Sequence, residues 1–122
     1  RSTSIPLSVT AQAESAALAS LEAEGELLER VRVIAERRDG LVEALRADGW
    51  RVPVAHGNFV WLATGAQTED ATQVFAEAGL VVRPFAGEGV RISVGEHTSV
   101  EHVLSAARRI VHNLPDGHPA RR

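Results

Sequence analysis

The sequence contains no cysteine, no methionine and no lysine, so all 13 of its basic side chains are arginines. Without cysteine it has no disulfide framework, no thiolate nucleophile and no cysteine-based metal site, which suits a reducing compartment. Without methionine it does not begin at a start codon, so we expect a fragment or a trimmed chain. It also lacks any apolar run near the roughly 20 residues that a membrane-spanning helix needs.

What remains is the composition of an ordinary soluble globular protein. The chain has 122 residues, of which 44% are hydrophobic and 24% charged, and this size fits a single domain. Its formal net charge is −3. A nucleic-acid-binding surface normally needs a clear basic excess, so we expect no nucleic-acid partner.

The first half of the sequence is rich in alanine, leucine and glutamate, which favour helices. We expect one helix over residues 8–24 with Ser8 or Thr10 as its N-cap, and Gly25 as a break or a tolerated weak point. A second helix is predicted over residues 26–48, ended by a glycine. Its apolar residues recur at helical spacings: Leu27, Val31, Ile34, Leu41 and Leu45.

Two further amphipathic helices are predicted in the second half. The first is capped by Thr68, carries two acidic residues in its first turn and stops at Gly79. The second runs to about residue 112, with Thr98 and Glu101 as a capping box. Their inward-facing residues are Ala71, Val74, Phe75 and Ala78 in the first, and Val100, Val103, Leu104, Ala107 and Ile110 in the second.

Three short β-prone runs separate these helices, at residues 58–62, 80–83 and 90–94. The first is almost wholly apolar, which predicts a buried strand. The order ααβαββα indicates an α+β fold: a small sheet of about three strands packed with helices, preceded by two long N-terminal helices. With no repeat or long linker, we expect a single domain over residues 1–114. Residues 115–122 have no apolar anchor and are predicted to be a flexible tail.

Arg91 and Arg83 are the candidate binding residues. Apolar residues alternate through residues 90–94, which turns Arg91 away from the core face of its strand. A guanidinium fixed on a strand suits two-pronged binding of a carboxylate or phosphate. Arg83 ends the preceding strand and lies near Arg91 if the two strands pair. The alternative for each is an arginine facing solvent on a half-buried sheet, and the residue pattern alone leaves both open.

The remaining motifs offer no catalyst. Gly87-Glu88-Gly89 lacks the lysine and following helix of a phosphate-binding loop, and predicts a tight connection between strands. His97 and His102 are separated by 102 − 97 = 5 positions, which does not place two ligands on one helix face. We therefore expect no metal site. Neither a nucleophile elbow nor a distinct pair of carboxylates is present.

Three segments nevertheless stand out together: Pro6-Leu7-Ser8-Val9-Thr10-Ala11-Gln12-Ala13, then Gly57-Asn58-Phe59-Val60-Trp61-Leu62, and last Val81-Val82-Arg83-Pro84-Phe85 running on to Gly89-Val90-Arg91-Ile92-Ser93-Val94-Gly95. In this order and at these separations they resemble the C-terminal small domain of fold-type I pyridoxal-phosphate-dependent aminotransferases. The likeness covers roughly residues 5–112. It is greatest to the histidinol-phosphate and aromatic (phenylalanine) aminotransferase branch, and residues 82–91 are especially similar to its actinobacterial members.

The resemblance implies a role for each arginine. Arg91 matches the arginine that binds the substrate α-carboxylate, and Arg83 matches one near the side-chain or phosphate end of the pocket. Residues 1–25 would form an interdomain helix or hinge beside an upstream cofactor domain, which supplies the Schiff-base lysine and the phosphate ligands. Since this chain has no lysine, we expect no cofactor bound to it and no activity from it alone.

The function implied for the parent enzyme is amino-group transfer between histidinol phosphate or an aromatic amino acid and 2-oxoglutarate. Such enzymes are cytoplasmic homodimers that use pyridoxal phosphate and have no membrane partner. Two departures from the family pattern, at Leu7 and at residues 96–100, leave the substrate open. The alternative is a non-catalytic α+β module that binds a carboxylate or another protein.

Overall fold

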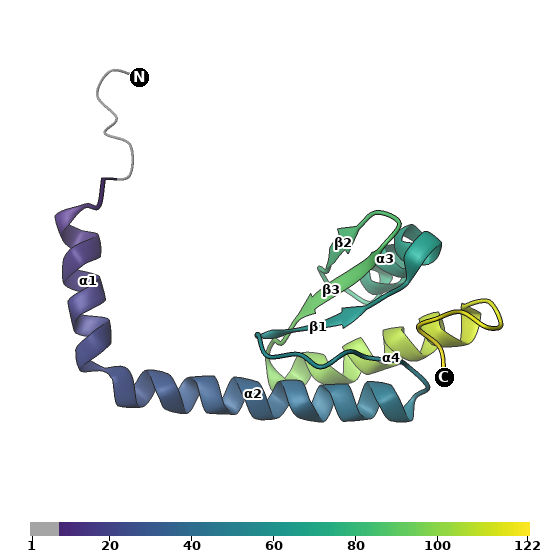
Figure 1. The fold of residues 1–122 in the computed structure, drawn as a ribbon, viewed down its shortest axis with the longest axis horizontal. Helices are drawn as coiled ribbons and strands as arrows, with labels where there is room; N and C mark the ends of the chain where they lie inside the picture. The colour runs from purple at the N-terminus through teal and green to yellow at the C-terminus, as the bar shows by residue number, and fades with distance from the viewer. Residues whose placement is uncertain (1–7) are drawn as a thin grey trace, which may run out of the picture. The chain divides into compact units, whose positions relative to one another are not determined.

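A computed structural model describes residues 8–122 of the chain, so Pro6, Leu7 and the rest of residues 1–7 lie outside the described residues. The order of the regular elements confirms the expected ααβαββα pattern and the α+β class (Figure 1). Residue contacts divide the chain into two compact units, of which the first ends at Val33 and the second begins at Ile34. The elements are α1 (Ala11–Glu22), α2 (Glu24–Ala47), β1 (Phe59–Leu62), a 3-10 turn (Gly65–Gln67), α3 (Thr68–Glu77), β2 (Arg83–Phe85), β3 (Gly89–Ser93) and α4 (His97–Asn113).

The first unit contains α1 and the start of α2. Thr10 is the N-cap of α1, because its hydroxyl accepts a hydrogen bond from the Ala13 amide at 3.2 Å. The helix ends at Ala23, whose amide donates to carbonyls of the preceding turn. Gly25 lies inside α2, so of the two alternatives for this residue the tolerated weak point is correct, and the helices are separated at Ala23 instead. A helix tolerates such a glycine at modest cost.

The helices of residues 8–33 expose large apolar side chains along their length. Leu21 is 70% exposed, and Leu28 and Val31 are each 59% exposed. The predicted apolar stripe of α2 is therefore buried only towards its C-terminal end, where Leu41 and Leu45 join the core of the second unit. A large exposed apolar surface is typical of an interaction site.

We expect the 122-residue chain to self-associate through these exposed leucines. Leu21→Glu combined with Leu28→Glu should shift the mass measured by light scattering after gel filtration towards the monomer. Val81 is fully exposed outside these helices, so Val81→Glu is the matched control and should leave the mass unchanged. A wild-type chain that is monomeric at all concentrations would contradict this expectation.

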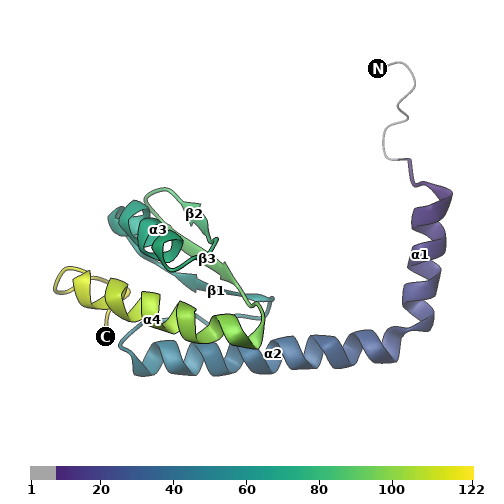
Figure 2. The same ribbon diagram turned by 180° about the vertical axis from the view of Figure 1, so that it is seen from behind.

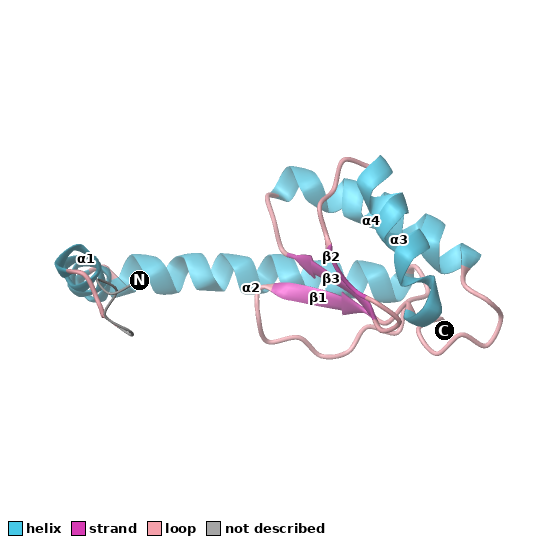
Figure 3. Cartoon of the chain, turned by 90° about the horizontal axis from the view of Figure 1, so that it is seen from above, coloured by secondary structure: helices cyan, strands magenta, loops and turns pink. Residues whose placement is uncertain are grey.

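The second unit, residues 34–122, is built on a three-stranded antiparallel sheet in the order β1-β3-β2. Helices α3 and α4 lie in front of the sheet in Figure 2 and on one side of it in Figure 3. No helix of residues 34–122 covers the opposite face, which is turned towards the viewer in Figure 1. The sheet therefore has one core face and one open face. The side chains on the core face are Val60, Leu62, Val90 and Ile92.

The strands alternate between these two faces as a pleated strand must. In β1, Val60 and Leu62 are buried, whereas Phe59 and Trp61 are half-buried on the open face. The strand predicted at residues 58–62 is in the right place, but only every second side chain of it is buried. The predicted alternation in residues 90–94 is confirmed, with Arg91 on the open face.

The hairpin between β2 and β3 is shifted from its predicted place. We expected a strand over residues 80–83, but β2 covers Arg83–Phe85. Leu80 instead closes α3, because its amide donates to the Phe75 carbonyl at 2.9 Å after Gly79 has turned the chain with φ +75°. Pro84 is tolerated because β2 is an edge strand. The tight connection predicted at Gly87-Glu88-Gly89 is confirmed.

Both predicted N-terminal caps in the second half are wrong. Thr68 is the first residue of α3, and its buried hydroxyl contacts the Gly65 carbonyl at 2.7 Å and the Thr64 hydroxyl at 2.9 Å. Helix α4 begins at His97, before Thr98, and its N-cap makes no side-chain hydrogen bond, so no capping box forms. Thr68 does not cap α3 because a 3-10 turn precedes the helix, and Thr98 does not cap α4 because that helix starts earlier than predicted.

The C-terminal residues are attached to the second unit. The Arg51 amide donates to the Ala120 carbonyl, and the Arg122 amide donates to the Gly49 carbonyl, both at 2.8 Å. Ala120 is 1% exposed, so the expectation that residues 115–122 lack an apolar anchor is wrong. A single small side chain gave no apolar pattern from which the sequence could indicate this packing.

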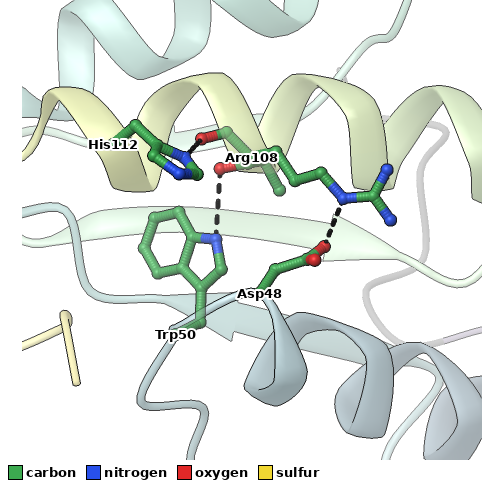
Figure 4. A network of polar contacts seen from close by, with 5 residues as sticks. Asp48, Trp50, Arg108 and His112 are labelled. Atoms are coloured by element: carbon green, nitrogen blue, oxygen red, sulfur yellow. Dashed lines mark hydrogen bonds and ion pairs between the residues drawn. The ribbon is translucent and has the colours of Figure 1, made fainter.

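Residues 48–51, which bind the C-terminal residues, are held against α4 by the polar contacts shown in Figure 4. The buried Trp50 indole donates to the Ala107 carbonyl at 3.2 Å, and Arg108 pairs with Asp48 at 2.8 Å. His112 donates from Nδ1 to the Arg108 carbonyl. These contacts hold the end of α2 against α4 and leave the open sheet face clear.

Candidate functional site

The two arginines singled out in the sequence are direct neighbours across the hairpin. Arg83 of β2 is paired with Arg91 of β3 in the antiparallel register, and Trp61 of β1 is opposite Arg91 on its other side. Directly opposite residues in antiparallel strands point to the same face. Arg91 is half-buried and Arg83 is exposed. The expected proximity of the two cations is therefore confirmed.

Three aromatic rings accompany the arginines, and sequence reasoning missed their role. The Arg91 guanidinium carbon lies 5.3 Å from the centroid of the Phe59 ring, and that of Arg83 lies 5.7 Å from Phe85. Trp61 and Phe85 meet edge to face, with centroids 5.5 Å apart. We call these five side chains on the open sheet face the arginine face. Because residues 58–62 are almost wholly apolar, the sequence carried no signal that Phe59 and Trp61 face away from the core.

Gly89 makes room for this arrangement. A Cβ atom at Gly89 would lie 2.6 Å from Cζ2 of the Trp61 indole and would also collide with the Leu62 carbonyl oxygen. The hairpin strand and β1 therefore approach more closely at this point than a side chain allows. The absence of a Cβ at this position lets the indole lie across the sheet beside Arg91.

The electrostatics of the arginine face favour an anion. Nε of Arg91 is buried and has no hydrogen-bond partner within residues 8–122. Neither Arg83 nor Arg91 forms an ion pair with a carboxylate in this part of the chain. A buried charged donor without an acceptor is costly. A carboxylate or phosphate placed against Arg91 would satisfy that donor and pair with the charge.

The arginine face has binding groups but no group suited to general acid–base or nucleophilic chemistry. Its members are two arginines and three aromatic rings, and none of them carries a carboxylate, imidazole, thiol, hydroxyl or amine group. Across residues 8–122, no group of three or more histidine, cysteine, aspartate or glutamate side chains could hold a metal ion. None of the helices in the same stretch combines the length and apolar character that crossing a bilayer requires.

Comparison with protein families matches residues 1–110 to the model for aminotransferase class I and II. An aromatic amino acid aminotransferase of Thermobifida fusca is 49% identical over 108 residues, which is 88% of this chain and 30% of the relative. One of Streptomyces avermitilis is 47% identical over 109 residues, or 89% of this chain and 30% of the relative. The chain thus spans about 30% of the length of the curated relatives it matches.

A solved structure from Burkholderia pseudomallei, assigned as an aminotransferase, shares the fold with a TM-score of 0.66. The similarity covers 75% of this chain and 29% of that one, at 24% sequence identity. The observed α+β arrangement therefore recurs within a larger protein.

Proposed function

The chain belongs to the class I and II aminotransferases, and we propose that it is the small domain of an enzyme that transfers the amino group of an aromatic amino acid to 2-oxoglutarate. The observation that carries the proposal is the arginine face, where Arg91 presents a buried Nε without an acceptor. The two bacterial relatives named above are aromatic amino acid aminotransferases, which supports the choice of donor. We propose that residues 1–114 form this domain, with residues 1–25 as its connection to the rest of the enzyme.

In this proposal Arg91 binds the α-carboxylate that every amino acid and 2-oxo acid substrate shares. A planar guanidinium on a paired strand holds a carboxylate by two parallel hydrogen bonds, which fixes both position and orientation. Binding in this way orients the amino group of the substrate for reaction. Such positioning removes much of the entropic part of the activation free energy. In the same proposal Arg83, one strand further out than Arg91, faces the side-chain end of the substrate.

Pyridoxal phosphate, the cofactor of the proposed enzyme, serves as the electron sink for amino-group transfer. The chain has no lysine, so its side chains do not fit the role of covalent attachment. We propose that residues outside this chain hold the cofactor, in a cytoplasmic homodimer. The part of the work assigned to this chain is substrate binding.

The test is an assay of the full-length protein that contains this chain. With pyridoxal phosphate and 2-oxoglutarate present, we expect glutamate to form from phenylalanine or tyrosine. Histidinol phosphate is the second candidate donor, because Arg83 offers a cation for its phosphate. Absence of glutamate with all three donors would overturn the proposal, and it would favour the alternative of a non-catalytic carboxylate-binding module.

Arg83→Ala should discriminate between these donors. Because Arg83 is exposed at the edge of the arginine face, its loss should reduce kcat/KM for histidinol phosphate about tenfold, the factor that corresponds to 1.4 kcal/mol. The value for phenylalanine should change by less than about threefold. Steady-state kinetics with both donors is the measurement. Equal losses for both would contradict a role at the side-chain end of the substrate.

A further inference from the structure

We propose that Phe59 is a positioning residue, which holds the guanidinium of Arg91 in the orientation that receives a carboxylate, and that Gly57 and Arg38 hold Phe59 in turn. The inference rests on the proposed function for the identity of the ligand. The contacts that link Arg38, Gly57, Phe59 and Arg91 do not depend on the identity of the ligand.

The Phe59 ring is the restraint on the Arg91 head group. The guanidinium carbon lies 5.3 Å from the ring centroid, a distance at which a cation is attracted to the face of an aromatic ring. Within residues 8–122, Arg91 makes no ion pair and its buried Nε makes no hydrogen bond. A long arginine side chain without such bonds samples several rotamers, and its freedom is lost when it binds. Stacking on Phe59 restricts the side chain before the ligand arrives.

The Phe59 ring is itself confined. A Cβ atom at Gly57 would lie 2.8 Å from Cε1 and 3.1 Å from Cδ1 of this ring, so the ring packs directly against the backbone of the preceding loop. Phe59 is also paired with Ser93 across β1 and β3. The ring therefore has little room to move away from Arg91, which lies two residues before Ser93.

The loop that confines the ring is tied to α2. Nη1 of Arg38 donates to the Gly57 carbonyl at 3.1 Å, and the Arg38 side chain is only 12% exposed. The same guanidinium pairs with Asp39 at 2.8 Å. Contacts thus run from α2 through Gly57 and Phe59 to Arg91, and all these residues lie within the second compact unit.

The hairpin supplies a matched comparison. Arg83 lies over Phe85 at 5.7 Å, which is the same type of contact, but Arg83 is exposed. Phe59→Leu and Phe85→Leu remove the same ring from two neighbouring arginines. Phe59→Tyr keeps an aromatic face in place and serves as the conservative variant.

In the full-length enzyme, Phe59→Leu should raise KM for phenylalanine about tenfold, a factor within the range of a desolvated cation–π contact. Because the carboxylate stays bound throughout the reaction, kcat should change by less than about twofold. Phe59→Tyr should restore KM, and Phe85→Leu should raise KM less than Phe59→Leu does. Val81→Ala, at an exposed residue outside the arginine face, should leave KM unchanged. A general folding defect would instead lower kcat through loss of active enzyme. A Phe59→Leu variant with wild-type KM would overturn the proposal.

A second readout on the 122-residue chain is independent of activity. The Hε resonance of Arg91 in an NMR spectrum should be displaced upfield by the Phe59 ring current, and Phe59→Leu should abolish the displacement. If Phe59→Leu leaves this resonance unchanged, the positioning role is wrong whatever the enzyme does. If the displacement is present and lost as expected while the full-length protein transfers no amino group, the proposed function fails and the support of Arg91 by Phe59 stands.

Discussion

Replacing Arg91 with alanine should lower kcat/KM for phenylalanine by about one to two powers of ten or more in the full-length enzyme. A two-pronged, charge-assisted hydrogen bond to a carboxylate contributes about 1.5–3 kcal/mol, and 1.4 kcal/mol corresponds to tenfold. In the proposed function this contact is made both to the bound substrate and in the transition state, so its loss should appear in kcat/KM. Steady-state kinetics on an aromatic donor is the measurement.

Arg91→Lys is the charge-conserving control for this prediction. A lysine keeps the positive charge but presents a point charge on a flexible stem, so it should restore little of the lost activity. Activity of Arg91→Ala within about twofold of wild type would contradict the assignment, since it would mean that Arg91 faces solvent. The structure argues against that alternative through the buried, unpartnered Nε of Arg91.

Gly89→Ala should destabilise the chain and damage the arginine face together. The added methyl group would collide with the Leu62 carbonyl oxygen and lie 2.6 Å from the Trp61 indole. A backbone oxygen cannot yield as the end of a flexible side chain does, so β1 and β3 must separate locally. Overpacking of this kind lowers the free energy of unfolding by about 1–3 kcal/mol. For a domain of this size, each kcal/mol lowers the melting temperature by about 4–8 °C.

The same substitution at Gly40 should have the opposite effect. Gly40 lies in α2 and is exposed, and a Cβ atom added there would meet no other group within 4 Å. Alanine at this position should raise the free energy of unfolding by about 0.5–1 kcal/mol, because it lowers the entropy lost on folding and favours the helix. Thermal melting of the two variants beside wild type measures both. If Gly89→Ala melted at or above the wild-type temperature, the close approach of β1 and β3 would be disproved.

Most of the fold was predicted from local composition, from the spacing of apolar residues and from the glycines that end helices. Helix-favouring composition located α1, and apolar spacing located the other three predicted helices. A β-prone apolar run located the strand at residues 59–62, and Gly79 ended α3 as expected.

The errors had both local and long-range causes. The Thr68 hydroxyl forms a buried hydrogen bond with the Thr64 hydroxyl. The C-terminal segment forms backbone hydrogen bonds with Gly49 and Arg51. Thr64 is only four positions before Thr68, but no signal in the sequence indicated the 3-10 turn between them. Gly49 and Arg51 are far from the C-terminal segment in the sequence and lie outside any local window.

The candidate site was predictable in part. The alternation of apolar residues at 90–94 predicted that Arg91 faces away from the core. The expected pairing of the two hairpin strands predicted that Arg83 lies near it, so both arginines could be named from the sequence. The aromatic rings could not be assigned to the site, because an apolar run such as residues 58–62 does not say which of its side chains face the core. Only the register between β1 and β3 placed Trp61 opposite Arg91.

The most direct measurement is a crystal structure of the full-length enzyme with 3-phenylpropionate, which has the carboxylate and ring of phenylalanine but no amino group to react. We expect both carboxylate oxygens within hydrogen-bond distance of the Arg91 guanidinium, about 2.7–2.9 Å, with Nε of Arg91 as one of the two donors and its guanidinium still stacked on Phe59. A carboxylate bound elsewhere, with Arg91 directed into solvent, would contradict the assignment of Arg91 as the carboxylate-binding residue.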